Sequence, residues 1–423
     1  MVSQAITVWI TTGLLFIVLL FLVDAVISRG AGWAANRSIL LVLRWLSRLF
    51  LAIVATLFVP ITVLELVLRR WSQRPLLSVK RSKAGFSTHG SDAVGSWTLS
   101  SHVMALRDPS FDENYWKEHE LQSAKMSVES WRPLQNGPII RRIASSHVGI
   151  QFNISEGERF TSDRPASFQN HVFCFGGSTT FCTEVPDRST WPSCLQRCLN
   201  AGNDTAAYRS RNLGIPGTPG LERILTLRHA TILNPRDVAV FLFGDNDSGW
   251  KMYGTREGKY SAHLPKMIGL LRRGAEVLEL AGWLYAELAP RYLRRLAVEM
   301  AETTIAAAEE AAKFAQSRGA NVLFVLQPNI FTLARPDDWD RKIIAGTARD
   351  LPIMLAAAYE RYRTWLKTSP IAVDATHIFN DEIPSPYMGD WGHVNTRGNQ
   401  LIGEFIFAEL DKRGLLAAPT SVN

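Results

Sequence analysis

The chain has 423 residues, of which 47% are hydrophobic and 20% charged, so it can bury a substantial core and has a globular rather than a disordered composition. The formal net charge is +7, but the basic residues are scattered or lie beside apolar segments. Because no basic arm with interleaved aromatic residues is present, we expect no nucleic-acid partner.

Two apolar segments near the N-terminus are each long enough to cross a bilayer. Residues 5–27 contain a single charged residue, Asp24, and residues 49–68 contain Glu65 and Pro60. A spanning helix needs about 20 mostly apolar residues, and proline is tolerated in membrane helices. We therefore expect residues 1–70 to form a membrane anchor with two transmembrane helices. The lipid bilayer is then one partner, and a membrane protein is a further candidate partner.

The topology of this anchor has two alternatives, a cleaved signal peptide and a single anchor with an interfacial helix. The first segment lacks a basic start, and no small-residue cleavage site clearly follows Ile27. Basic residues follow both segments, so the positive-inside rule barely decides the orientation. The uncharged start MVSQ favours translocation of the N-terminus, which predicts an extracytoplasmic, periplasmic location for the large C-terminal domain.

Buried strands and amphipathic helices alternate between residues 131 and 415, after a polar stretch at 71–130 that we expect to be a linker with peripheral elements. The expected strands are 171–175, 210–213, 237–243, 321–326 and 371–374, and the expected helices are 191–200, 221–230, 298–317, 351–366 and 399–410. This alternation predicts an α/β fold, a three-layer α/β/α sandwich with a central parallel sheet, preceded by the two transmembrane helices.

The segment 264–297 breaks this alternation because it is too long for a simple crossover. It is apolar and carries the arginines Arg272, Arg273, Arg291, Arg294 and Arg295. We expect a helical insertion, which is either an elaborated surface pair, a cap over the site, or an interfacial helix on the bilayer.

The four cysteines, Cys174, Cys182, Cys194 and Cys198, fall within one short window. Zinc needs Cys pairs at close spacing together with further Cys or His ligands, and that pattern is incomplete here, so we expect no metal site. In an oxidising compartment, a disulfide between Cys182 and Cys194 or Cys198 is one alternative, and simple packing is the other.

Polar, turn-forming residues follow three of the expected strands. They are FGGST with Ser178, NLGIPG with Gly217, and FGDND with Asn246. Further along, GDWGH places Asp390 three residues before His393. In an open parallel sheet, ligands bind beyond the carboxyl ends of the strands. Each block alone also has a structural interpretation as a turn, a cap or a surface histidine, but together they predict one site.

In this order, the four blocks resemble those of the SGNH, or GDSL-like, hydrolase family. The resemblance covers about residues 131–410 and includes the lead-in FNISEGERFT at 152–161 and the continuation VPDRSTWPSCL at 185–195, as in membrane-anchored bacterial members. It implies the flavodoxin-like sheet arrangement of that family. The first block reads Gly-Gly-Ser where the family often has Gly-Asp-Ser, which leaves open whether the pocket differs from that of soluble esterases.

The resemblance also implies the roles of the site residues. Ser178, His393 and Asp390 would form a catalytic triad, and Ser178, Gly217 and Asn246 would form the oxyanion hole. No cofactor is needed for this chemistry.

The expected function is that of a membrane-anchored serine esterase. Its substrate would carry ester-linked acyl groups, O-acetyl for example, on a glycan or a lipid-linked molecule. One alternative is an acyltransferase that uses the same serine, and another is a non-catalytic membrane component with a binding domain. Candidate substrate-binding residues are Gln327 and Asn329, which follow the 321–326 strand, and Trp250 and Trp391, whose rings suit stacking on sugars; packing is the alternative role of these tryptophans and of Trp339.

Overall fold

The computed structural model describes residues 101–123, 127–131, 140–144, 146–149, 151–201, 208–248, 270–271, 279–347 and 350–416, together with Trp45 and Leu49. The chain divides into two compact units, Met1–Arg81 with Lys259–Arg291, and Ser82–Gly258 with Tyr292–Asn423. The predicted transmembrane segments lie outside the described residues, apart from Leu49. Within the described ranges, no helix is both long enough and apolar enough to cross a membrane.

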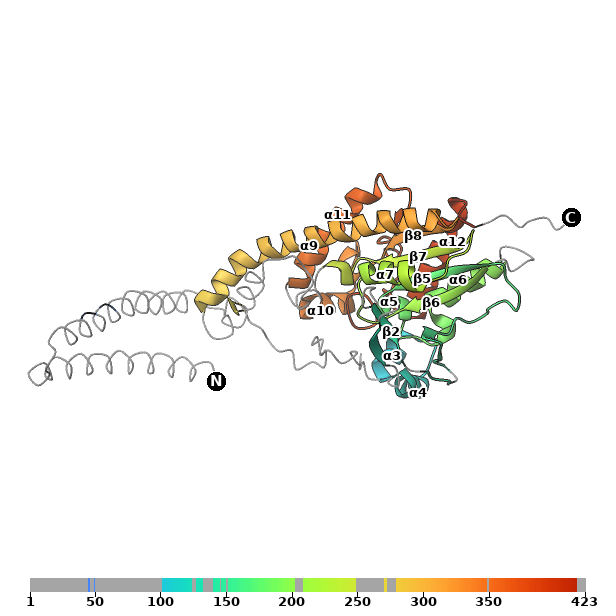
Figure 1. Ribbon diagram of the computed structural model, residues 1–423. Helices are drawn as coiled ribbons and strands as arrows, with labels where there is room; N and C mark the ends of the chain where they lie inside the picture. The colour runs from blue at the N-terminus through green and yellow to red at the C-terminus, as the bar shows by residue number, and fades with distance from the viewer. Residues whose placement is uncertain are drawn as a thin grey trace, which may run out of the picture. The chain divides into compact units, whose positions relative to one another are not determined.

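The second unit is built on a seven-stranded sheet with the order β3-β4-β6-β5-β7-β8-β9 (Figure 1). Its parallel strands are β5 (Asn170–Gly176), β6 (Tyr208–Gly214), β7 (Val238–Phe243), β8 (Asn321–Leu326) and β9 (Ala372–Asp374). The short strands β3 (Ile154–Ser155) and β4 (Glu158–Arg159) add an antiparallel edge. The predicted α/β fold with a mostly parallel sheet is confirmed, whereas the antiparallel edge was not predicted.

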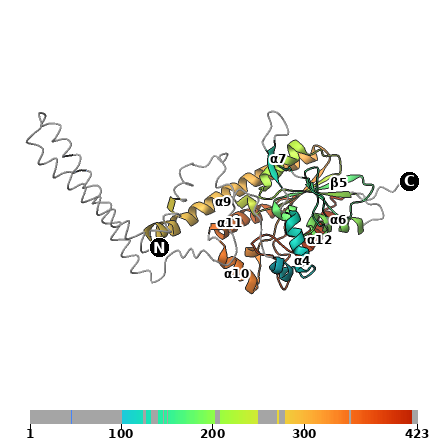
Figure 2. The same ribbon diagram turned by 90° about the horizontal axis from the view of Figure 1, so that it is seen from below.

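Two helices cover one face of this sheet, α6 (Trp191–Ala201) and α12 (Thr396–Lys412) (Figure 2). Their apolar side chains form one buried cluster with alternate residues of the strands, such as Val172 and Val240. The two helices approach closely, because a Cβ atom added at Gly403 of α12 would lie 2.7 Å from the Cβ of Cys194. This layer buries the apolar faces that the sequence periodicity indicated.

The opposite face of the sheet carries a row of phenylalanines. The ring centroids of Phe175 and Phe241 are 4.8 Å apart, and those of Phe241 and Phe324 are 4.6 Å apart. Helix α11 (Asp350–Leu366) packs Tyr362 and Trp365 against Phe243. Helix α7 (Gly220–Ala230) and the part of α9 (Glu279–Gln316) that lies in this unit belong to the same layer. Glu309 of α9 accepts from Trp365 of α11, and Glu310 accepts from Arg228 of α7. Helices therefore cover both faces.

Helix α9 differs from the prediction. The sequence predicts an insertion at 264–297 and a separate helix at 298–317, but residues 279–316 form one helix of 38 residues with Pro290 inside it. The Ala- and Glu-rich composition continues across the expected boundary, so nothing in the local propensity ends the helix there.

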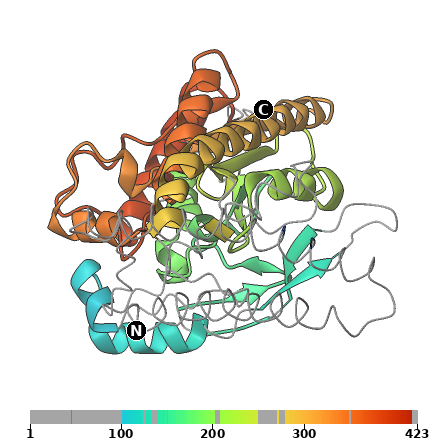
Figure 3. The same cartoon turned by 90° about the vertical axis from the view of Figure 1, so that its left-hand side faces the viewer.

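The segment predicted as a linker contributes to the second unit. It contains α3 (Ser101–Arg107), α4 (Glu113–Ser123) and the first strand of a hairpin, β1 (Val128–Trp131), which pairs with β2 (Ile140–Ile143). Figures 1 and 3 both show α3 and α4 on the side of the sheet away from α11. Arg107 donates to the carbonyls of Ser385, at 2.6 Å, and Tyr387, at 2.9 Å. The 101–123 segment is therefore fastened to the loop between β9 and α12. The short helix α10 (Asp338–Gly346) lies between β8 and α11 in the chain.

All four cysteines are free thiols. The Cys182 thiol is buried and donates to the side-chain oxygen of Asn399, at 3.1 Å. Burial raises the pKa of each of these thiols. The structure therefore has the packing alternative and not the disulfide.

Candidate active site

The turn between β5 and the short helix α5 (Ser178–Phe181) carries the predicted nucleophile. A Cβ atom at Gly176 would lie 2.1 Å from the Oγ1 of Thr180, and one at Gly177 would lie 2.3 Å from the Nδ2 of Asn246. Gly177 has φ −86°, which any residue adopts. The two glycines are therefore required by the close approach of neighbouring atoms, and not by a left-handed backbone. Ser178 follows them and is partly exposed.

The predicted oxyanion-hole residues come together at this turn. Asn246 follows β7 and donates from Nδ2 to the carbonyl of Thr218, at 3.2 Å. A side-chain amide has two N–H groups, so a second one remains for a ligand beside Gly177. Gly217 has φ +77°, a left-handed conformation that favours glycine. The carbonyl of Gly217 accepts from Arg141, at 3.3 Å, which in turn is paired with Glu222, at 2.6 Å.

The predicted acid–base pair is formed within one loop. The Oδ2 of Asp390 lies 2.6 Å from the Nδ1 of His393, and Oδ1 accepts from the backbone N–H groups of Gly392 and His393 at 2.8 and 2.7 Å. Both side chains are buried. Burial alone would raise the pKa of Asp390, but the charge of His393 and these hydrogen bonds hold it below its ordinary value. Asp390 is thus an ionised carboxylate at neutral pH that fixes one ring nitrogen.

The loop with the acid–base pair touches the nucleophile turn. A Cβ at Gly392 would lie 3.7 Å from the Cγ2 of Thr179, the residue after Ser178. The backbone N–H of Ile330 donates to the carbonyl of Trp391, at 2.8 Å, which ties the loop to the end of β8. Glu184, in the segment after α5, is buried and interacts electrostatically with His393 and Asp390. The neighbours of Ser178 and of His393 in sequence are therefore neighbours in space.

The predicted substrate-binding residues have protein partners. Gln327 accepts from the hydroxyl of Thr179, at 3.0 Å, and Asn329 donates to Asp245, at 3.2 Å; both residues are buried. Trp391 is half-buried against the α6–α12 cluster. Trp339 is also half-buried and lies under the guanidinium of Arg107, while Trp250 lies outside the described residues.

One supporting residue that was not singled out is Arg159, in the lead-in segment. Its side chain is fully buried, pairs with Asp187 at 2.9 Å, and donates to the carbonyls of Phe181, at 2.8 Å, Cys182, and Val185, at 2.5 Å. These carbonyls belong to the end of the nucleophile helix and the segment after it. The signal in the sequence was the lead-in motif itself, which contains this arginine.

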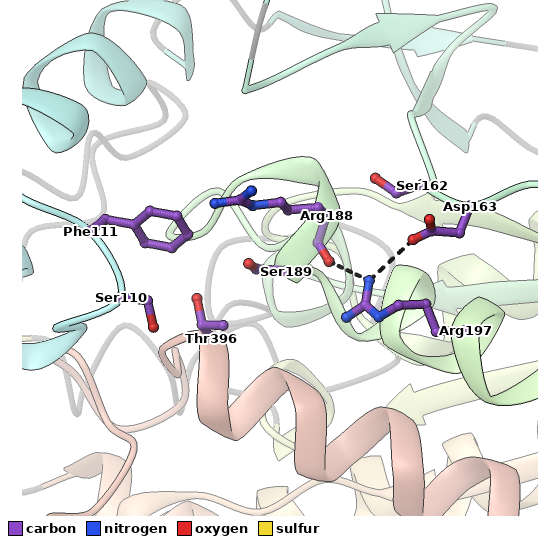
Figure 4. Close-up of a pocket in the computed structure, with 8 residues that line it drawn as sticks. All are labelled: Ser110, Phe111, Ser162, Asp163, Arg188, Ser189, Arg197 and Thr396. Atoms are coloured by element: carbon purple, nitrogen blue, oxygen red, sulfur yellow. Dashed lines mark hydrogen bonds and ion pairs between the residues drawn. The ribbon is translucent and has the colours of Figure 1, made fainter. Parts of the chain in front are cut away.

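A surface pocket of about 530 Å³ lies elsewhere in the unit (Figure 4). It is lined by residues that include Phe111, Arg188, Arg197 and Thr396, and none of Ser178, Gly217, Asn246 or His393 lines it. Arg197 bonds to the carbonyl of Arg188, at 2.8 Å, and to Asp163, at 3.4 Å. The residues of the candidate site are therefore not those that line this pocket.

No family model matches the sequence, and no curated protein matches it. Among solved structures, the chain is similar to a protein assigned to the G-D-S-L lipolytic family from Desulfitobacterium hafniense DCB-2, with 11% identity, 57% of this chain and 100% of that chain covered, and a TM-score of 0.35. A lipolytic G-D-S-L family member from Veillonella parvula DSM 2008 has 15% identity, covers 57% and 96%, and has a TM-score of 0.33. A GDSL-like lipase from Bacteroides thetaiotaomicron VPI-5482 has 16% identity, covers 57% and 88%, and has a TM-score of 0.31.

TM-scores and identities this low do not by themselves establish an activity. The functional conclusion therefore rests on the side chains of the site.

Proposed function

We propose that this chain is a serine ester hydrolase of the SGNH type. The observation that carries this conclusion is the 2.6 Å contact between Asp390 and His393, on a loop that touches the turn bearing Ser178. The Asn246 amide beside Gly177 supports it, because a hydrolase of this kind needs a donor next to its nucleophile.

The mechanism follows from the chemistry of these groups. A serine hydroxyl is a weak nucleophile and needs a base, so His393 takes the proton of Ser178 as its Oγ attacks the acyl carbonyl. Asp390 orients the ring and stabilises the imidazolium that forms. The backbone N–H groups of Ser178 and Gly217 and the amide of Asn246 stabilise the oxyanion. His393 then returns the proton to the leaving alcohol, and water releases the acyl group from Ser178.

For the substrate, we propose an ester-linked acyl group on a glycan or lipid-linked molecule, with O-acetyl as the leading candidate. For the location, we propose that residues 5–27 and 49–68 anchor the chain in a membrane with the catalytic domain outside the cytoplasm. The support for the anchor is the length and apolar composition of these two segments. A reporter fused at the C-terminus tests the side, because a cytoplasmic signal contradicts the proposed orientation.

The activity is tested with Ser178→Ala on a chromogenic acetyl ester. We expect loss of turnover with an unchanged melting temperature. Ser317→Ala is the matched control, since this exposed serine only bonds the carbonyl of Phe314, at 2.7 Å, and should leave turnover as it is. Undiminished turnover in Ser178→Ala rejects this site.

Transfer of the acyl group to a sugar uses the same first half-reaction, so the acyltransferase alternative needs a separate measurement. Products are analysed with and without a sugar acceptor. Free acetate in both reactions supports hydrolysis, and an acylated sugar supports transfer.

A further inference from the structure

Asp245 is a buried carboxyl group between the oxyanion donor and the acid–base loop. It precedes Asn246 in the turn after β7 and is 8% exposed. Its Oδ1 accepts from the hydroxyl of Tyr359 in α11, at 2.8 Å, and from the amide of Asn329 after β8, at 3.2 Å. Tyr359 also donates to the carbonyl of Gln327, at 3.0 Å. Asp245, which follows β7, is thus held by a residue that follows the neighbouring strand β8 and by a residue of helix α11.

The other oxygen of Asp245 faces the acid–base loop. A Cβ at Gly392 would lie 2.6 Å from the Oδ2 of Asp245, so the carboxyl packs against the backbone between Asp390 and His393. Among the described residues, no donor reaches Oδ2 in hydrogen-bond geometry, although the Gln327 amide is close enough to lower the pKa of this carboxyl. A side chain at position 392 would force either the Asp245 carboxyl or the loop to shift.

The charges around Asp245 link it to the acid–base pair. Burial raises the pKa of Asp245 to about 7, and the negative charge of Asp390 adds to this rise, while hydrogen bonds from Tyr359, Asn329 and Gln327 act in the opposite direction. On the loop before α12, Tyr387 is also buried and interacts with both Asp245 and Asp390. Glu184 is a further buried carboxyl that interacts electrostatically with His393 and Asp390.

Asp247, two residues along, provides a contrast. It is equally buried, but its two oxygens accept from the backbone N–H groups of Gly220, at 2.5 Å, and Gly244, at 3.0 Å. Asp247 therefore stabilises its own turn and the start of α7, whereas Asp245 reaches across to Gly392.

We propose that Asp245 is a positioning residue of the active site, which sets the distance between the Asn246 turn and the Asp390–His393 loop and is electrostatically coupled to that pair. This inference rests on the proposed hydrolase function. Neither the family resemblance nor the four sequence blocks assign a role to this position, which lies between the glycine and asparagine of the third block.

The sign of the coupling follows from electrostatics. When Asp245 ionises, it places a second negative charge near the imidazole and favours the imidazolium form of His393. The base must be neutral to accept the Ser178 proton. The acid limb of the pH profile, where the rate rises with pH, therefore lies at a higher pH when Asp245 is ionised than when its charge is absent. In Asp245→Asn the charge is absent, and the acid limb should move to lower pH, by less than about one unit, because a carboxyl with a pKa of about 7 carries only part of its charge in this range.

Two further variants separate this coupling from a general loss of packing. Asp247→Asn removes a buried carboxylate of the same turn and should reduce stability without moving the acid limb. Tyr359→Phe removes a hydrogen bond that lowers the pKa of Asp245, so Asp245 stays neutral to a higher pH. The limb should then move in the same direction as in Asp245→Asn, by a smaller amount.

The experiment uses the full-length chain and two readouts across pH 5–9, the rate of Ser178 labelling by a fluorophosphonate and the kcat and KM on a chromogenic acetyl ester. We expect Asp245→Asn to lower kcat several-fold with little change in KM and to shift the acid limb of both readouts. Circular dichroism shows which variants are folded. If Asp245→Asn is not folded, the inference is tested with Tyr359→Phe.

Two results overturn the inference. The first is an acid limb in folded Asp245→Asn at the same pH as in the wild type; if Asp245→Asn does not fold, the same result in Tyr359→Phe counts instead. The second is a shift of the acid limb in Asp247→Asn that equals the shift in Asp245→Asn. A wild-type chain that the probe does not label overturns the proposed hydrolase function and the inference with it. Wild-type labelling together with an unchanged limb in the variants overturns the inference alone.

Discussion

Replacing Asn246 by alanine separates the proposed catalytic role of its amide from the structural role. The side chain donates one hydrogen bond to the backbone carbonyl of Thr218, at 3.2 Å, and is partly exposed. Losing a bond of this kind costs about 1 kcal/mol of folding stability. Losing an oxyanion donor costs about 3 kcal/mol of transition-state stabilisation, which is about a 10²-fold decrease in kcat. The effect on the reaction should therefore exceed the effect on the fold by about 2 kcal/mol.

The assay compares kcat on a chromogenic acetyl ester with the free energy of unfolding from urea titration. Asn321→Ala is the matched control, because Asn321 also donates from its side-chain amide to a carbonyl, that of Leu415 at 3.1 Å, but lies at the opposite end of the parallel sheet. Both variants should lose similar stability, and only Asn246→Ala should lose turnover. If kcat in Asn246→Ala falls less than tenfold, or falls equally in the control, the oxyanion role of Asn246 is wrong.

Three other changes test the turn and the loop. Arg159→Met should lower the free energy of unfolding by about 3–5 kcal/mol in a denaturant titration, because it leaves the buried carboxylate of Asp187 unpaired; a loss below about 1 kcal/mol contradicts this. Gly177→Ala should reduce turnover at least about tenfold while the protein stays folded by circular dichroism, since the new Cβ displaces the Asn246 amide, 2.3 Å away; wild-type turnover refutes the steric argument. The pKa of Asp390 is lowered in the folded state, so its pairing stabilises the fold at pH values above the ordinary pKa of 3.8, and this stability is lost as the pH falls through the folded-state pKa. Below about pH 4, the free energy of unfolding of Asp390→Asn should therefore depend less steeply on pH than that of the wild type. An unchanged slope argues against the pairing.

The strands and the chemical blocks were predictable from sequence because each is a local pattern. Runs such as VAVFLF in β7 and NVLFVL in β8 are apolar on both faces, as a central parallel strand requires. The edge strands β3 and β4 have two residues each, which is too short for any period to appear. The end of the predicted insertion was misplaced because the Ala- and Glu-rich sequence of α9 has no local stop signal near residue 297.

The supporting side chains of the site were not predictable for a different reason. Tyr359 lies in the middle of α11, where a tyrosine is typical of a core-facing position, and its bond to Asp245 joins residues 114 positions apart. Asp245 and Asp247 look equivalent in the sequence GDND, and both fit loop hydrogen bonding. Only the position of Gly392 in space shows that one of them faces the acid–base loop and the other its own turn.

The glycines at 176 and 177 show how neighbouring elements restrict the conformation of the turn that carries Ser178. The space where a side chain would stand at 176 is taken by Thr180, and at 177 by the amide of Asn246. From the lead-in segment, Arg159 binds carbonyls at the end of the same short helix. A four-residue helix has little stability of its own, so the position of Ser178 depends on these contacts from other elements. The turn is thus oriented by the Asn246 amide and by the buried Arg159, which makes the geometry around Ser178 a property of the whole unit and not of the FGGST sequence alone.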